Sequence, residues 1–201
     1  MVQISVVGCD GCGKSTLIEM LRLVIPSTGQ GIPIVVKRPR EVLPSYRGNT
    51  DTLYASYLTA LKIANDNPQF HFLFDRFVVD QIVYSVLRGE DLMGTGEQLL
   101  QDRYWKLYKQ LEHDPKFWTI FIDEKVETIF QRTKSRGEDY LKPEDVQRII
   151  DRFKILSSSY LGNKIVLKPG ENVSTRVQQV ISQIFYGGPT SFGDLVGDID
   201  G

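Results

Sequence analysis

A short glycine-rich run near the N-terminus has the residue types and the spacing to bind phosphate. The run from Gly8 to Ser15 reads GCDGCGKS and fits the pattern G-x-x-x-x-G-K-[ST]. Glycines let backbone N–H groups turn toward phosphate oxygens with no Cβ in the way, and a following helix adds positive potential at its N-terminus. The pattern therefore predicts a loop that binds a nucleoside triphosphate. Its predicted binding residues are Gly8, Gly11, Cys12, Gly13, Lys14, Ser15 and Thr16.

Two side chains of this loop carry its predicted chemistry. In such loops the lysine, here Lys14, reaches the β- and γ-phosphates, and the hydroxyl of the next residue, here Ser15, binds Mg²⁺. The loop thus predicts a nucleoside triphosphate and Mg²⁺ as cofactors, with ATP as the expected phosphoryl donor, but leaves the reaction open. The alternatives are a small-molecule kinase and an ATPase or GTPase that couples hydrolysis to movement or to partner binding.

Two apolar runs that end in acids bear on this choice. Residues 118–124, WTIFIDE, read as a strand followed by two acids, which favours an ATPase with Glu124 as its base. Residues 70–75, FHFLFD, end equally well in Asp75 and are followed by Arg76, which favours a kinase. A GTPase is less favoured because the sequence has no N-K-x-D segment for guanine recognition.

A second group of cations lies at the end of the helix expected from residue 125. Arg132 and Arg136 are four residues apart and share one helical face, and Gly137 frees the chain directly after them. Alone, such cations simply complement the helix dipole in solvent. Beside a phosphate loop, arginines stabilise the charge that spreads over a transferred phosphoryl group, and a hinged segment expels water. The spacing therefore predicts an arginine-bearing lid at about 132–143.

Cys9 and Cys12 are the only cysteines, and their C-x-x-C spacing occurs in redox pairs and in half zinc sites. Both occupy variable positions of the loop pattern. No further zinc ligands stand at a recognisable spacing. We therefore interpret the spacing as incidental to the loop.

The arrangement of short apolar runs and longer helix-period segments predicts an α/β fold. The expected strands are Ile4–Val7, Ile34–Val36, Phe70–Phe74, Trp118–Ile122 and Ile165–Leu167. The expected helices are 14–25, 51–66, 77–88, 97–112, 125–135, 144–160 and 173–185. This order predicts a five-stranded parallel sheet covered by helices on both faces.

Length, charge and composition narrow the function classes. The 201 residues suit one domain, here 1–186, and the glycine- and aspartate-rich residues 187–201 are expected to form a mobile tail. The 24 Lys and Arg against 25 Asp and Glu give a net charge of −1, which argues against a broad nucleic-acid surface. No apolar stretch approaches the roughly 20 residues of a membrane span, and the apolar N-terminus is too short for a signal peptide. We expect a cytoplasmic protein with small-molecule partners and no membrane segment.

Taken together, these residues resemble the thymidylate kinase family of nucleoside monophosphate kinases, from about Gln3 to Phe185. Phosphate loops are common, but an aspartate inside the loop, a D-R-F segment and lid arginines in this order are more specific. The resemblance rests on GCDGCGKST at 8–16, Pro39, Leu53-Tyr54-Ala55, Asp75-Arg76-Phe77, Ile122-Asp123, RTKSRG at 132–137, Asp139, Phe153 and Tyr160. It implies phosphoryl transfer from ATP-Mg to a deoxynucleoside 5′-monophosphate, giving the diphosphate.

The same resemblance assigns the acceptor site. It implies that Asp10 binds the sugar 3′-hydroxyl and that Arg76 clamps the 5′-phosphate, for which a guanidinium is suited by its two parallel donors. Asp75 is implied to lie close to Mg²⁺ and to order its waters. Tyr54 matches the aromatic residue that stacks on the base. Tyr84 matches the ring that packs against the sugar and disfavours a 2′-hydroxyl.

Two positions that read the base in this family have changed character. Leu58 replaces an arginine that reads a thymine carbonyl, and Asp80 replaces a small or polar residue. A carboxylate facing a base prefers a donor edge, so we expect guanine or a hydroxylated pyrimidine to be accepted better than thymine. Arg38, directly before Pro39, completes the predicted acceptor-binding residues.

The sequence thus predicts a nucleoside monophosphate kinase. The first alternative is a deoxynucleoside kinase, which usually has Glu-Arg-Ser where this chain has Asp75-Arg76-Phe77, and the alternative of another class is the partner-coupled ATPase. The predicted catalytic residues are Lys14, Asp75, Arg132 and Arg136, and the predicted Mg²⁺ ligands are Ser15 and Asp75. The base, the choice between ATP and GTP, and the formation of a homodimer stay open.

Overall fold

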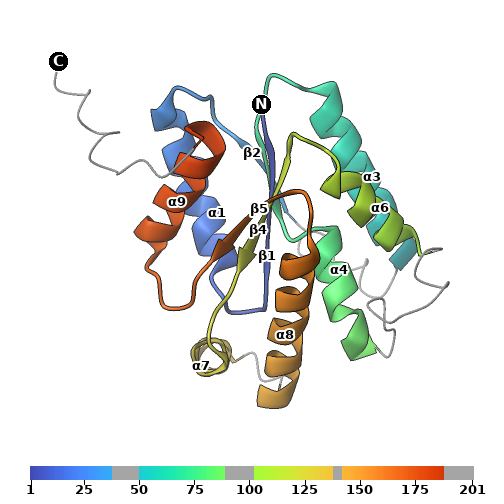
Figure 1. Ribbon diagram of the computed structural model, residues 1–201, viewed down its shortest axis with the longest axis vertical. Coiled ribbons are helices and arrows are strands. Elements are labelled where there is room, and N and C mark those ends of the chain that lie inside the picture. The colour runs from blue at the N-terminus through green and yellow to red at the C-terminus, as the bar shows by residue number, and fades with distance from the viewer. Residues whose placement is uncertain (38–49, 89–101, 138–141, 188–201) are drawn as a thin grey trace.

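A five-stranded parallel sheet lies at the centre of the molecule, between two layers of helices (Figure 1). This computed structural model describes residues 1–37, 50–88, 102–137 and 142–187. The strands are β1 (Gln3–Gly8), β2 (Ile34–Val36), β3 (Phe72–Asp75), β4 (Phe117–Ile122) and β5 (Asn163–Leu167). They pair in the order β2-β3-β1-β4-β5, and each pairing is parallel. The predicted five-stranded parallel sheet is therefore confirmed.

The central strand β1 shows why the strands were readable from sequence. It pairs with β3 on one side and β4 on the other, so that Ser5 lies opposite both Phe74 and Thr119. Every residue of β1 is buried. A strand covered on both faces needs a continuous apolar run rather than an alternating one, so such runs in the sequence predict the strands.

The helices follow the strands in alternation and cover both faces. They are α1 (Lys14–Val24), α3 (Thr50–Asp66), α4 (Val78–Tyr84), α6 (Arg103–Glu112), α7 (Val126–Ser135), α8 (Pro143–Ser159) and α9 (Val173–Phe185), with 3₁₀ segments η1 (Ile25–Thr28) and η3 (Ser85–Arg88). In Figure 1, α1 and α9 lie on one side of the sheet, and α3, α4, α6 and α8 lie on the other. Among these described helices, none is both long and apolar enough to cross a membrane.

All five strands point the same way, so their carboxyl ends meet at one edge of the sheet. The loop from β1 to α1, Asp75 and Arg76 at the end of β3, and the Asp123-Glu124 segment after β4 all lie at this edge. In Figure 1 the loop between β1 and α1 lies close to α7. In open parallel sheets, ligands bind outside the carboxyl ends of the strands. The fold therefore gathers the segments that the sequence singled out.

Two elements near β3 differ from their predicted bounds. The strand begins at Phe72 rather than Phe70, because the N–H of Phe70 donates to the carbonyl of Asn67 in a turn and the Phe70 side chain is 41% exposed. The helix predicted over 77–88 ends at Tyr84 and continues as a 3₁₀ turn.

The helix predicted over 97–112 begins only at Arg103. Asp102 has an extended backbone and caps the helix, since its Oδ1 accepts from the N–H groups of Tyr104 and Trp105 at 2.7 and 3.1 Å. An N-cap aspartate satisfies donors that the first helical turn leaves open, so the helix cannot run through this residue. Residues 97–101 of that prediction, and the predicted tail from 188 onward, lie outside the described residues.

His71 makes the stability of the fold depend on pH. The Nδ1 atom of the buried ring accepts from the N–H of Val2 at 3.2 Å, and Nε2 lies 3.2 Å from Oε1 of Gln30, an arrangement that suits the neutral imidazole. Burial lowers the pKa of His71 below its ordinary value of 6.5. The unfolded chain therefore binds more protons than the folded protein in the window below pH 6.5, and acid shifts the equilibrium toward unfolding.

We expect the free energy of unfolding to be constant with respect to this group above pH 6.5 and to decline as the pH falls below it. Urea unfolding at pH 7.5 and 5.5 measures the difference. His71→Gln should reduce it, and His113→Gln, at an exposed position, serves as the matched control. An unchanged difference in a folded His71→Gln protein would contradict this role.

Candidate functional site

The loop between β1 and α1 folds around the ammonium group of Lys14. This residue begins α1, its side chain is only 4% exposed, and its Nζ donates to the carbonyls of Gly8 and Cys9 at 2.6 and 2.8 Å. Nζ also lies 3.6 Å from Oδ1 of Asp10. Ser15 lies exposed beside it in the first turn of α1. The cation is therefore fixed inside the loop next to the helix N-terminus, where anions bind.

The backbone conformations of Gly11 and Gly13 in the loop would be strained with any other residue. Gly13 caps α1 in the left-handed conformation, at φ 101°. Gly11 has φ 85°, and a Cβ built on it would meet Cγ2 of Thr133 at 3.0 Å and the carbonyl of Ile129 at 3.2 Å. The absence of a side chain at Gly11 thus lets α7 pack directly on the loop.

Arg76, the residue directly after β3, is turned toward the phosphate loop. Its guanidinium lies 2.6 Å from Oδ1 of Asp10, and its side chain is 20% exposed. Arg76 has φ 63°, the one described non-glycine residue with a positive φ. This conformation costs about 1–2 kcal/mol for a residue with a Cβ, and such strain clusters at functional sites. The strained backbone places the guanidinium beside Asp10 of the loop, while the clamping of a 5′-phosphate that the resemblance implied stays a prediction.

The oxygen-bearing side chains of Ser15 and Asp75 lie together next to Lys14. The Ser15 hydroxyl donates to Oδ2 of Asp75 at 3.4 Å. The other carboxylate oxygen, Oδ1 of Asp75, is buried and has no hydrogen-bond partner. A hydroxyl and a carboxylate are the hard oxygen ligands that Mg²⁺ prefers, so the donor set fits this ion. Within the described ranges, no group of three or more His, Cys, Asp or Glu side chains is arranged to hold a metal ion.

Tyr84, the last residue of α4, contacts the phosphate loop. The Tyr84 hydroxyl accepts from the N–H of Asp10 at 2.8 Å, and its ring packs edge-on against Phe153 of α8. Burial raises the pKa of Tyr84 well above its ordinary value, so the hydroxyl stays protonated. Asp80 is buried, and its Oδ2 accepts from the N–H of Phe77 at 3.3 Å at the start of α4. Asp80 thus points inward and supports the helix start, while its role toward a base stays a prediction.

The opposite side of the loop holds three charged residues that sequence reasoning did not connect. Glu124 after β4 is 4% exposed, and its Oε2 lies 3.2 Å from the guanidinium of the buried Arg176 of α9 and 3.5 Å from that of Arg132. Arg132 also donates to the carbonyl of Gly11 at 3.3 Å. Arg132 therefore lies next to the loop, while its part in an arginine-bearing lid stays a prediction. Glu124 is held by cations, which argues against its use as a hydrolytic base.

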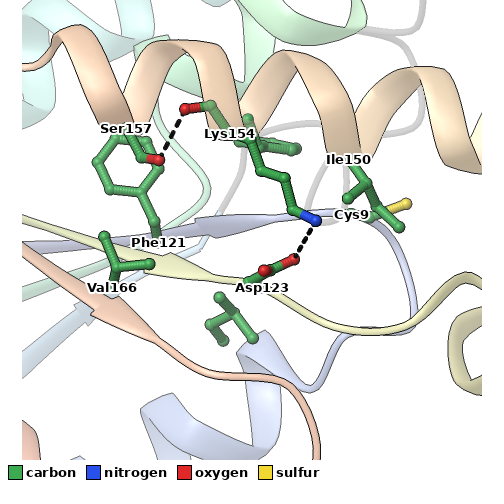
Figure 2. Close-up of a pocket in the computed structure, with 9 residues that line it drawn as sticks. Cys9, Phe121, Asp123, Ile150, Lys154, Ser157 and Val166 are labelled. Atoms are coloured by element: carbon green, nitrogen blue, oxygen red, sulfur yellow. Dashed lines mark hydrogen bonds and ion pairs between the residues drawn. The ribbon is translucent and has the colours of Figure 1, made fainter.

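A small cavity separates Asp123 from helix α8, as Figure 2 shows. The Lys154 side chain extends from α8 toward Asp123, and the two charged atoms lie 3.6 Å apart. Phe121, Ile150 and neighbouring apolar groups line the space, which measures about 30 Å³. Ligand pockets measure roughly 300–1,000 Å³, so this cavity does not hold a nucleotide.

Both cysteines of the loop are buried in the structure. Burial raises the pKa of Cys9 to about 12 and also raises the pKa of Cys12. Thiols react through the thiolate, so both groups are protonated and inert at neutral pH. This agrees with the interpretation of the C-x-x-C spacing as incidental.

We expect a thiol reagent such as Ellman's reagent to label neither cysteine quickly at pH 7.5 and to label both after unfolding in urea. A Cys9→Ala variant should keep the activity of the parent protein to within about threefold, because the thiol has no chemical part in the loop. Rapid labelling of the folded protein, with inhibition reversed by dithiothreitol, would contradict this assignment.

Several predicted residues lie away from this cluster or outside the described ranges. Tyr54 packs edge-on against Tyr104 of α6, and the guanidinium of Arg103 lies 4.9 Å from the Tyr54 ring centre. Leu58 is 42% exposed and lines a groove of about 430 Å³ along the C-terminal halves of α3 and α6, which lead to the amino edge of the sheet. Arg136 is exposed at the end of α7. Arg38 and residues 138–141 of the predicted lid fall outside the described residues.

Comparison with solved structures places this geometry in a known fold. The YorR protein from Bacillus subtilis, solved with phosphorylated GDP, has a TM-score of 0.63 and 18% identity over 91% of this chain and 95% of its own. A deoxyadenosine kinase from M. mycoides with bound dATP has a TM-score of 0.62 and 17% identity, over 91% of this chain and 99% of its own. The same enzyme with the products dCMP and dCDP has a TM-score of 0.57 and 15% identity, over 93% of this chain and 100% of its own.

These likenesses show a shared fold, the P-loop α/β fold with a five-stranded parallel sheet. No family model and no curated protein matches the sequence.

Proposed function

We propose that this protein transfers the γ-phosphoryl group of ATP to a deoxynucleoside 5′-monophosphate. The observation that carries the proposal is the placement of guanidinium groups on both sides of one phosphate loop. Arg76 lies on the β3 side, at 2.6 Å from Asp10, and Arg132 lies on the α7 side, at 3.3 Å from the carbonyl of Gly11. A site that binds one triphosphate for hydrolysis needs cations around that group alone, whereas a transferase must hold two phosphate groups in line.

The donor half of the site consists of the loop and the residues next to it. Backbone N–H groups at the start of α1 and the Lys14 ammonium provide positive charge for the β- and γ-phosphates. Ser15 and Asp75 are suited to hold Mg²⁺, which when bound neutralises charge on the phosphate oxygens. Ser15 lies in the first turn of α1 and Asp75 is the last residue of β3. Both candidate ligands are therefore held by regular secondary structure.

The acceptor half of the site is supported by Arg76 and Asp10. The guanidinium of Arg76 is suited to bind a 5′-phosphate through two parallel hydrogen bonds. The carboxylate of Asp10 is an acceptor, and a sugar hydroxyl is a matching donor. Tyr84 holds the backbone of Asp10 through its hydroxyl, which keeps the carboxylate beside Arg76.

Arg132 is placed to stabilise charge during transfer. Its contacts to Gly11 and Glu124 are long, at 3.3 and 3.5 Å, and its side chain is 45% exposed. Arg176 already balances the charge of Glu124. Arg132 can therefore leave this carboxylate and bind a phosphate group instead. Catalysis then rests on positioning and charge stabilisation, to which a cis arginine contributes rate factors of up to ~10³–10⁵.

A monophosphate acceptor fits the described carboxylates better than a nucleoside does. The nucleophilic oxygen of a phosphate monoester is largely ionised at neutral pH, since its second pKa is about 6, whereas a 5′-hydroxyl needs a general base. In the part of the chain that the structure describes, Asp10 and Glu124 next to the loop are paired with Arg76 and Arg176, and Asp75 is the proposed Mg²⁺ ligand beside Ser15. This supports a monophosphate as the acceptor.

A deoxynucleoside kinase is the second candidate, because solved structures of similar fold include a deoxyadenosine kinase. A steady-state assay of ADP formation separates the two candidates and the ATPase. With ATP and Mg²⁺ alone, the rate should be low, and a deoxynucleoside 5′-monophosphate should raise it by orders of magnitude. Acceleration by nucleosides alone would favour the second candidate, and fast acceptor-independent release of phosphate would favour an ATPase.

A further inference from the structure

Arg176, in the first turn of α9, joins three segments that meet behind the phosphate loop. Its side chain is 7% exposed. One terminal nitrogen donates to the carbonyl of Cys12 at 3.4 Å, and the other donates to the carbonyl of Lys168 at 2.9 Å and to Oε2 of Glu124 at 3.2 Å. The guanidinium therefore connects the loop after β1 with the ends of β4 and β5.

Glu124 is held in place from several directions. Its Oε1 accepts from the N–H groups of Lys125 and Gly170, at 3.1 and 3.3 Å, while Oε2 faces Arg176. Charged groups are costly to bury, and replacing a buried ion pair by apolar residues is often neutral or stabilising. Stability alone therefore gives a poor reason for this pair at the carboxyl edge of the sheet.

The position of Arg176 relative to the loop suggests another reason. A Cβ built on Gly13 would lie 3.9 Å from Nη1 of Arg176, so the guanidinium is directly behind the Cys12–Gly13 peptide. In a planar trans peptide the C=O and N–H groups point in opposite directions. Because the Cys12 carbonyl points toward Arg176, the N–H of Gly13 points away from it, toward the side where the loop binds phosphate.

We propose that Arg176 is a positioning residue of the triphosphate site, which orients the Cys12–Gly13 peptide through its hydrogen bond to the Cys12 carbonyl, with Glu124 as its anchor. This inference rests on the proposed binding of ATP. Arg176 does not touch the phosphates. Its effect is exerted through the loop backbone, and it is already in place before the nucleotide binds.

Titration calorimetry with MgATP tests the role of Arg176. Arg176→Met should raise the dissociation constant for MgATP by about tenfold or more. This is the loss of affinity expected for one hydrogen bond to a charged group. Arg176→Lys keeps the charge but loses the planar fork, and it should recover part of the affinity. The matched control is Arg22→Met, which removes an exposed arginine of α1 and should leave the affinity unchanged.

A double variant separates positioning from stability. Arg176→Met combined with Glu124→Gln leaves no unpaired buried charge, so it should keep a melting temperature near that of the parent protein while still binding MgATP about tenfold more weakly. A purely structural role predicts the reverse, a lower melting temperature with unchanged affinity of the folded protein. Unchanged affinity in the folded variants would overturn this inference alone, whereas no MgATP binding by the parent protein would overturn the proposed function and this inference with it.

Discussion

Replacing Lys14 with methionine should lower kcat by about 10²–10³-fold or more, the usual cost of removing one donor that stabilises transition-state charge. The ammonium is fixed inside the loop by the carbonyls of Gly8 and Cys9, so no other described cation occupies its position. Methionine keeps the apolar stem of the side chain and removes the charge. Steady-state kinetics with saturating ATP and acceptor measures the effect.

The same substitution should leave the protein folded. Lys14 makes two hydrogen bonds to backbone carbonyls, each contributing roughly 1.5–3 kcal/mol, and removal of the buried charge offsets part of their loss, so the cost stays within the roughly 5–15 kcal/mol that holds a typical domain together. Lys62→Met, at an exposed ion pair on α3, is the matched control and should change neither property. A folded Lys14→Met protein with nearly full kcat would remove Lys14 from the site.

Replacing Arg76 should act on the acceptor rather than on ATP. Arg76→Met should lower kcat/KM for the monophosphate acceptor by about 10²–10³-fold, while the KM for ATP changes by less than about threefold. The reason is that Arg76 pairs with Asp10 at 2.6 Å, on the proposed acceptor side, whereas Lys14 is held by the carbonyls of Gly8 and Cys9, where we propose that the donor phosphates bind. Initial rates with each substrate varied in turn measure both constants.

Arg76→Lys distinguishes charge from geometry. Lysine keeps the cation but lacks the planar pair of donors, so it should restore only part of the acceptor kcat/KM. Arg22→Met again controls for the loss of one positive charge. If Arg76→Met weakened ATP and acceptor equally, the division into a donor half and an acceptor half would be wrong.

The sequence predicted the sheet well because each strand is a local feature. Apolar runs such as the one that ends at Val7 are buried on both faces, and burial dictates composition within the run itself. Errors arose where a local contact ended an element, as with the turn that exposes Phe70 and the cap formed by Asp102. Hydrophobic periodicity does not report such hydrogen bonds.

Sequence patterns single out individual candidate residues of the site, but they do not show which residues distant in sequence make contact. The phosphate loop and the Asp75-Arg76 segment stand out because each is a pattern of neighbouring residues. By contrast, Arg176 and Glu124 are 52 positions apart, and Tyr84 and Asp10 are 74 apart, so only the folded chain brings them together. The sequence marks Asp123 and Glu124 as acids that follow a strand, but it does not show that Arg176 neutralises Glu124. The left-handed backbone of Arg76 also has no sequence signal, because this residue type rarely adopts it.

Identification of the product is the most direct test of phosphoryl transfer to a monophosphate. The protein is incubated with ATP, Mg²⁺ and each nucleoside or nucleoside 5′-monophosphate in turn, and the products are resolved by ³¹P NMR and mass spectrometry. The account predicts equal amounts of ADP and a deoxynucleoside 5′-diphosphate, with at least one monophosphate as a good acceptor. ADP with free phosphate in every reaction, or a monophosphate formed from a nucleoside as the only transfer product, would contradict it.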